Sequence, residues 1–385
     1  MYQKATDSPA TARAKHALHA KLILGEAKRD EILRKTAEMV ITDFPLEPGK
    51  FHVSAKNNQL RVHMGGRWDA PHRIHSHALG QLCDRANPDI PRKFIRALIK
   101  GPLWQQRLAQ IALNLIYTRG SYITRSKKPA WFMGRFVGPA DARELRGFVS
   151  QYFPRHLLSK DMFRGFVHNC SQMGAHPIEG SSSDLRFNLK CALPHVFEPV
   201  PGEFFGFGVE LSNSDFGTGL LCVRFFSHYL KRNTFAVLEK SWAKKHIGSV
   251  VKMSELTLGQ EAREKDRDAV ITVMGDAVKQ VLSAENVNKM LTVLEEAHKE
   301  KLPWHRVEAE MGRILRKAEL TQLKKDVESR EEVSALPPVD LDDDGNPSPT
   351  RWWMSEVAGF MATKEMNPER AAELEKLAGT LLKAG

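Results

Sequence analysis

The sequence Val209-Glu210-Leu211-Ser212-Asn213-Ser214-Asp215-Phe216-Gly217-Thr218-Gly219-Leu220-Leu221-Cys222-Val223 predicts a strand, a tight turn and a second strand. Asn213, Ser214 and Asp215 are residue types whose side chains hydrogen-bond nearby backbone in turns, and glycines tolerate positive φ or close backbone approach. Strands joined by so short a turn pair antiparallel in most folds. We therefore expect an antiparallel sheet here, with structural turn residues Asn213, Ser214, Gly217 and Gly219.

The segments around this turn alternate between strand and helix patterns. Period-two alternation predicts strands at 185–191, 203–211 and 220–226, and a hairpin at 51–64 with its turn at 56–59. A further strand pair is expected at 122–124 and 131–133. Helical spacing predicts helices at 15–41, 74–86, 92–119 with a break at Gly101-Pro102, 141–152 and 161–173, and residues 103–116 are apolar enough for a core helix.

The last third of the chain has helical periodicity. Apolar stripes recur from about 254 to 332, and a final helical pair is expected at 352–382, with Asn367-Pro368 starting its second helix. The predicted fold class is α+β, an antiparallel sheet with flanking helices followed by a C-terminal helical region. The predicted organisation is an N-terminal helical segment (1–48), a basic α+β core (49–250), a helical region (251–335), an acidic Pro-rich linker (336–350) and C-terminal helices (351–385).

Composition limits the class of protein. The chain has 385 residues, 42% of them hydrophobic, which excludes wholesale disorder. No apolar run approaches the roughly 18 residues that span a membrane, and Met1 to Arg13 lacks the apolar core of a secretory signal. The four cysteines are far apart, which predicts reduced, buried thiols. We therefore expect a cytoplasmic protein with no membrane partner.

The charge is distributed unevenly along the chain. The net charge is +11, but residues 1–250 hold 37 Lys/Arg against 20 Asp/Glu, whereas residues 251–385 hold 20 against 26. A basic N-terminal part followed by an acidic C-terminal part is typical of proteins that bind a polyanion. The alternative is that the basic residues only keep the surface soluble.

Two clusters combine cations with aromatic residues, around 119–136 and 224–245. Cations neutralise phosphates and aromatic rings stack on unpaired bases, a combination suited to single strands. A second interpretation makes the aromatics core residues of strands and the cations their solvated faces. The candidate phosphate contacts are Arg125, Lys127, Lys128, Arg135, Lys231, Arg232, Lys244 and Lys245, and the candidate stacking residues are Trp131 and Tyr229.

Other chemistry is weakly represented. No phosphate-binding loop of the Walker type and no Gly-x-Ser-x-Gly elbow occurs, and the short Gly-Phe-Gly and Gly-Thr-Gly motifs open no obvious βαβ unit, so no cofactor is expected. His72, His75 and His77 could approach zinc, but no second pair completes a tetrahedral set, and surface histidines are the alternative. The calcium-loop-like start at Asp340 has Arg351 where the bidentate Glu belongs. Asp184 and Asp215 are too isolated to make a nuclease the leading hypothesis.

The order of these motifs resembles a phage- and plasmid-like protein family, domain of unknown function 932. The resemblance covers roughly 75–380 and rests on His77-Ala78-Leu79, on Leu145 to Tyr152, on the Asn213-Ser214 turn, and on Glu373 to Leu382. In that order a helix rich in Arg and aromatics follows the second strand. The family's Arg-x-x-Cys-x-Asn-Gly element is incomplete here, because 228–234 keeps Asn233 without the Cys and Gly. The resemblance implies a mobile genetic element in a bacterial host.

Two functional hypotheses follow. The first is a mobile-element protein that binds nucleic acid, with single-stranded DNA favoured, acts as a homo-oligomer, and serves ATP-independent strand annealing or recombination. The second is a structural or assembly protein of a phage particle or replication machinery. An enzyme is the less favoured class, because no catalytic constellation stands out.

Overall fold

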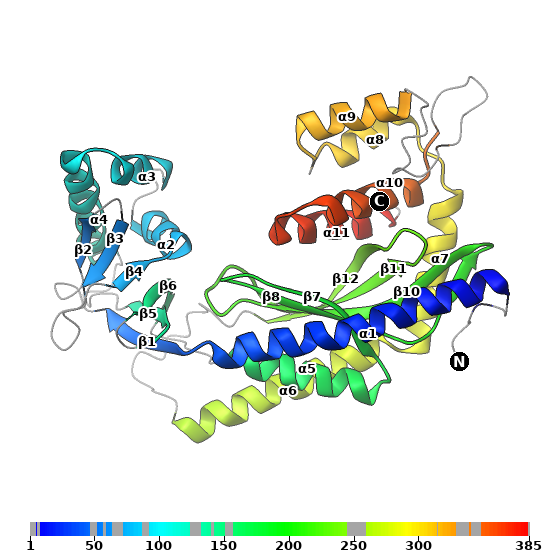
Figure 1. The fold of residues 1–385 in the computed structure, drawn as a ribbon, viewed down its shortest axis with the longest axis horizontal. Helices are drawn as coiled ribbons and strands as arrows, with labels where there is room; N and C mark the ends of the chain where they lie inside the picture. Colours follow the sequence, from blue (N-terminus) through cyan, green and yellow to red (C-terminus); the bar gives the residue numbers. More distant parts are fainter. Residues whose placement is uncertain are drawn as a thin grey trace.

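The computed structural model describes residues 5, 8–46, 52–56, 59–63, 72–86, 92–123, 132–139, 142–150, 157–244, 259–313, 315–328, 339 and 348–383. They form two six-stranded sheets, each packed against helices, which confirms the α+β class with a helical C-terminal region (Figure 1). Within the described residues, no helix has the length and apolarity needed to cross a bilayer. All four cysteines are free and buried.

The first sheet has the strand order β1-β5-β6-β4-β3-β2. Its neighbours are antiparallel except β4 and β6, which pair in parallel. The sheet packs on helices α2 to α4 through a core that includes Val62, Ile95, Leu113 and Phe136. The elements are β1 (Ile41–Leu46), β2 (His52–Lys56), β3 (Gln59–His63), β4 (His72–Ile74), α2 (Ser76–Ala86), α3 (Arg92–Lys100), α4 (Leu103–Ile123), β5 (Phe132–Val137) and β6 (Glu144–Ser150).

The second sheet has the order β12-β11-β10-β8-β7, with β9 paired to β10. Helices α5 and α6 cover one face, α10 and α11 pack on the other, and α1 runs along β7 (Figure 1). Its elements are α1 (Pro9–Glu38), α5 (Ser159–Gln172), β7 (His176–Ser182), β8 (Phe187–Ala192), β9 (Phe197–Val200), β10 (Glu203–Asn213), β11 (Leu221–Tyr229), β12 (Thr234–Lys244), α6 (Gln260–Val281), α7 (Ala284–Lys299), α8 (Trp304–Met311), α9 (Lys317–Glu328), α10 (Arg351–Lys364) and α11 (Pro368–Leu381).

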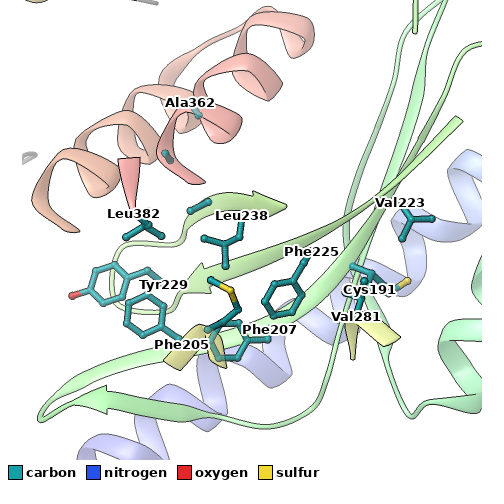
Figure 2. Close-up of a cluster of buried hydrophobic side chains, with 14 of the residues drawn as sticks. Cys191, Phe205, Phe207, Val223, Phe225, Tyr229, Leu238, Val281, Ala362 and Leu382 are labelled. Carbon is teal, nitrogen blue, oxygen red and sulfur yellow. The ribbon is translucent and has the colours of Figure 1, made fainter. Parts of the chain in front are cut away.

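Successive side chains of β10 lie on opposite faces of the second sheet. Phe205, Phe207, Val209 and Leu211 belong to the main apolar core, where they meet α5 and α6. Figure 2 shows Phe205 and Phe207 gathered with neighbouring strand residues and with Val281 of α6. Each fully buried phenylalanine contributes about 1.5–3 kcal/mol of transfer free energy. The intervening residues of β10 point to the opposite face, which carries charge.

Capping residues define where several helices begin. The Asn367 side chain accepts hydrogen bonds from the backbone of Glu369 (2.9 Å) and Arg370 (3.3 Å), and Pro368 follows as the first residue of α11. Thr350 Oγ1 caps α10 in the same way. A side-chain acceptor and an N-terminal proline are preferred at these positions because the first backbone N–H groups lack helical partners. The predicted start of the last helix at Asn367-Pro368 is confirmed.

Several local predictions were wrong. Residues 144–150, expected within a helix, form β6, whose alternation is interrupted by a register shift opposite Arg135/Phe136. Residues 234–244, expected in a helix rich in Arg and aromatics, form β12. Tyr122 and Ile123 lie in α4 instead of a strand. The range 49–250 contributes to two separate sheets, and β1 lies within the segment 1–48 that was expected to be helical.

Candidate nucleic-acid interface

The turn after β10 is held by its own side chains. Ser214 Oγ accepts hydrogen bonds from the backbone N–H of Phe216 (3.3 Å) and Thr218 (3.1 Å), and from the Thr218 hydroxyl (2.7 Å). Gly217 has φ +84°, a conformation that residues with a Cβ rarely adopt. These contacts shape the backbone between β10 and β11. Of the four predicted turn residues, Ser214, Gly217 and Gly219 lie in this turn, and Asn213 is the last residue of β10.

Asn213 and Asp215 attach this turn to the start of α5. Asn213 Nδ2 donates to the Leu157 carbonyl (3.3 Å) and to Ser159 Oγ (3.0 Å), and Asp215 Oδ1 accepts from the Ser159 backbone N–H (2.9 Å). Burial raises the pKa of Asp215, while the Ser159 hydrogen bonds and the Arg135 charge oppose the rise. The Asp215 carboxylate is therefore engaged in holding the turn.

Arg135 connects the first sheet to this turn. Its guanidinium donates two hydrogen bonds of 2.8 Å to the Asp43 carboxylate and one of 2.7 Å to the Asp215 carbonyl. Its side chain is 2% exposed. The expectation that Arg135 contacts phosphate was wrong, because the side chain is buried and all its contacts lie within the protein.

Phe216 meets the first sheet from the same turn. Its carbonyl accepts hydrogen bonds from His77 Nε2 (2.9 Å) and Gln81 Nε2 (3.2 Å) of α2. A Cβ on Gly147 of β6 would lie 3.0 Å from that carbonyl oxygen. Among the described residues, no three His, Cys, Asp or Glu side chains are arranged as metal ligands. The turn thus joins the two sheets, and its polar groups are largely used in doing so.

Tyr229 is a core residue. It is 4% exposed, its hydroxyl donates to the Glu203 carboxylate, and its ring lies 5.1 Å from Phe205 and 5.5 Å from Trp352. Burial and the Glu203 carboxylate raise its pKa. The expectation that Tyr229 stacks on bases was wrong, because no free ring face remains exposed.

Of the other predicted phosphate and stacking residues, three lie within the described residues and five lie outside them. Lys231 lies beside Tyr229 at the β11–β12 turn and forms an ion pair of 3.1 Å with Glu203, with Arg232 next to it. Lys244 ends β12, and nothing is described of its side chain. Five candidates lie outside the described residues: Arg125, Lys127, Lys128, Trp131 and Lys245.

A buried ionic cluster fixes α11 to the charged face of the second sheet. Lys190 Nζ lies 2.6 Å from Glu375 of α11, 3.1 Å from Glu179 and 4.0 Å from the centre of the Phe235 ring. Burial alone would lower the pKa of Lys190, but the surrounding carboxylates raise it. Burial raises the pKa of Glu375 to about 7 despite its lysine partner. This arrangement is a structural attachment of the C-terminal helix.

A second buried carboxyl, that of Glu356, belongs to α10. The Thr234 hydroxyl donates one hydrogen bond shared between Glu356 Oε2 (3.0 Å) and Oε1 (3.2 Å), and burial raises the pKa of Glu356 to about 8. A carboxyl whose pKa rises on folding stabilises the folded state below its unfolded pKa. That stability is lost as the pH rises toward the folded value.

We therefore expect the free energy of unfolding to fall between pH 5 and pH 9, and Glu356→Gln to flatten this fall. The amide keeps a similar shape and does not ionise. One pKa unit corresponds to about 1.4 kcal/mol, so the effect is on the order of 2–4 kcal/mol. Urea denaturation at both pH values measures it. Glu373→Gln, at an exposed carboxylate of α11, is the control. If the free energy of unfolding fell equally between pH 5 and pH 9 in the wild type and in Glu356→Gln, the expectation would be contradicted.

Helices α3 and α4 carry a basic surface. Residues 92–123 contain six Lys/Arg and no Asp or Glu. Trp104 is 64% exposed and Phe94 is 51% exposed. In an α-helix, Trp104, Arg107, Leu108 and Ile111 share one face by their spacing. We name the α3–α4 surface by its exposed residues Lys93, Phe94, Arg96, Lys100, Leu103, Trp104, Arg107, Leu108 and Ile111.

This surface was not predicted from the sequence. Residues 103–116 were expected to form a core helix because of their apolar content, yet the side chains that face the core are Gln106, Ala109 and Leu113. The usable signal was the absence of acidic residues over 92–123, together with a tryptophan in the first turn of a helix flanked by cations. This surface brings cations and exposed aromatics together in the way expected for 119–136 and 224–245.

Comparison with known proteins adds no relative: no family model, no curated protein and no solved structure matches the chain. The resemblance to the phage- and plasmid-like family therefore rests on its short sequence motifs alone. The candidate site is therefore judged by the chemistry of the α3–α4 surface. On this exposed surface, positive charge surrounds aromatic and apolar side chains.

Proposed function

We propose that this protein binds single-stranded nucleic acid, with DNA favoured, through the α3–α4 surface. The observation that carries the proposal is the exposure of Trp104 and Phe94 within a segment that has six cations and no carboxylate. Lys93, Arg96, Lys100 and Arg107 neutralise phosphates and release counterions. The two aromatic rings stack on unpaired bases, which a duplex keeps inside its helix.

Strand annealing without ATP, in a phage, prophage or plasmid, is the activity we propose for such binding. A surface that holds a single strand by phosphate contacts and stacking leaves hydrogen-bonding edges of the bases free to meet a complement. The setting in a mobile element follows from the sequence motifs and is part of the proposal.

Trp104→Ala is expected to weaken binding of a single-stranded oligonucleotide about tenfold, because one base–aromatic stack is worth about 1–3 kcal/mol.

Lys93→Ala combined with Arg107→Ala is expected to reduce the slope of log K against log salt by about 1.4 for two lost phosphate contacts. Fluorescence anisotropy across a salt series measures both effects.

A matched control is Lys317→Ala combined with Lys325→Ala, which removes two exposed cations of α9 in the acidic half of the chain. This variant is expected to keep the wild-type affinity and salt slope. If both double variants changed the slope equally, the binding would be unspecific attraction to net charge and the α3–α4 surface would lose its role.

An assembly role is the second candidate, and the exposure of Leu103, Leu108 and Ile111 favours it. Contiguous exposed apolar side chains mark protein interfaces. A homo-oligomer formed through this face would bury them. Light scattering with and without a single strand separates the roles: an assembly that ignores DNA and is lost in Leu108→Glu supports the second candidate.

A further inference from the structure

A cavity of about 580 Å³ opens between β4, α2 and α3. Arg73, Arg96 and Lys100 line it, and Ser76, the first residue of α2, adds a hydroxyl. Ligand pockets for small molecules span about 300–1,000 Å³. This cavity therefore has room for more than an inorganic anion.

The charge in the cavity is unbalanced. Among the described residues that line it, Glu144 is the one acidic side chain, and its carboxylate lies 2.9 Å from Arg146 Nε. Within the described part of the chain, Arg73, Arg96 and Lys100 form no hydrogen bond or ion pair through their side chains. The cations therefore remain available to a ligand that carries negative charge.

The remaining wall is apolar. Leu60, Ile74 and Ile99 contribute to the lining. A ligand that suits both parts carries a phosphate and a flat or apolar body. A terminal phosphate monoester carries a charge of about −1.5 to −2 near neutral pH, more than the single charge of an internal phosphodiester. Arginine pairs with such a group through two parallel hydrogen bonds.

We propose that this cavity binds a nucleotide through its 5′-phosphate. Arg73, Arg96 and Lys100 hold the phosphate, Ser76 donates to it at the positive end of α2, and the apolar wall takes the sugar or base. Where the nucleotide is the end of a strand, the inference rests on the proposed function, since Arg96 and Lys100 also belong to the α3–α4 surface. A free mononucleotide is the other source of the same chemistry.

The test compares a labelled single strand bearing a 5′-phosphate with the same strand bearing a 5′-hydroxyl. The wild type is expected to bind the phosphorylated strand about tenfold more tightly, because charge-assisted hydrogen bonds are the strong ones. Arg73→Ala is expected to abolish the preference while retaining affinity for the hydroxyl strand. Lys93→Ala, outside the cavity, is expected to weaken both strands equally. Arg73→Lys, with unchanged thermal unfolding, keeps the charge and part of the preference.

A second arm titrates thymidine 5′-monophosphate by calorimetry, with thymidine as the control. If the nucleotide binds to the wild type and not to Arg73→Ala, the cavity is a nucleotide site. If in addition no strand binds, the proposed function is contradicted while the nucleotide site stands. Nucleotide binding without an end preference identifies the free nucleotide as the source. Equal affinity for both strands together with no binding of the nucleotide would overturn the inference and leave strand binding by the α3–α4 surface intact.

Discussion

Lys190→Ala is expected to lower the free energy of unfolding by about 3–5 kcal/mol, the usual cost of removing one partner from a buried ion pair. The side chain of Lys190 is 3% exposed and lies between Glu179 and Glu375. Without it, the Glu375 carboxyl stays buried beside Glu179 and Glu210, which already help raise its pKa. The second sheet would then lose its charged attachment to α11.

The size of this loss depends on pH. The pKa of Glu375 is about 7 with Lys190 in place, and Lys190 lowers it. Removing the lysine therefore raises the pKa of Glu375 further, so the variant folds only with this carboxyl protonated, and the free-energy cost of taking up that proton is larger at pH 8 than at pH 6. Guanidinium denaturation at both pH values measures the difference.

Lys231→Ala is the matched control, because Lys231 also pairs with a glutamate but its side chain is 48% exposed. Exposed ion pairs contribute about 0–1 kcal/mol. A loss below about 1 kcal/mol in Lys190→Ala at pH 8 would show that the cluster is not a structural attachment.

Arg135→Ala is expected to lower the free energy of unfolding by a similar amount, about 3–5 kcal/mol, because it removes both hydrogen bonds of the guanidinium to the buried Asp43 carboxylate. It also removes the 2.7 Å hydrogen bond from the guanidinium to the Asp215 carbonyl, which links the first sheet to the β10–β11 turn. Arg135→Lys is expected to recover only part of the loss, since an ammonium cannot form the paired hydrogen bonds to Asp43 and reach Asp215 as well.

Chemical denaturation followed by both tryptophan fluorescence and limited proteolysis tests this prediction. Loss of the link is expected to separate the unfolding of the two sheets into different transitions. Arg34→Ala on α1 is the control, because its ion pair with Glu38 is exposed on both sides. Unfolding of Arg135→Ala in one transition within about 1 kcal/mol of the wild type would contradict the role assigned to Arg135.

The sequence predicted those elements that are determined by residues close together in the chain, such as a hairpin and a helix start. The 51–64 hairpin is confirmed, because strict alternation around a polar turn leaves one register. The Asn367-Pro368 helix start is confirmed for a similar reason, since its capping hydrogen bonds span only three residues. Strand β6 was missed, because its register shift breaks the alternation and its partners β4 and β5 are set by tertiary pairing.

The candidate site could be predicted only in its chemistry. Positive charge with interleaved aromatics was expected in the basic half of the chain, and the structure shows that combination exposed at 92–111. From the sequence, Arg135 and Tyr229 were expected to contact nucleic acid, and a core position was the alternative for Tyr229. Their partners Asp43 and Glu203 lie 92 and 26 residues away, and no local pattern reports such pairings. Exposure depends on which face of a helix meets the core.

Photo-crosslinking tests the central claim most directly. A single-stranded oligonucleotide containing 5-bromodeoxyuridine is irradiated with the protein at low salt, and the crosslinked peptides are identified by mass spectrometry. Binding through the α3–α4 surface predicts crosslinks within residues 92–111, centred on Trp104 and Phe94, that Trp104→Ala reduces. No crosslink at low salt, or crosslinks confined to the acidic half at 259–328, would contradict it.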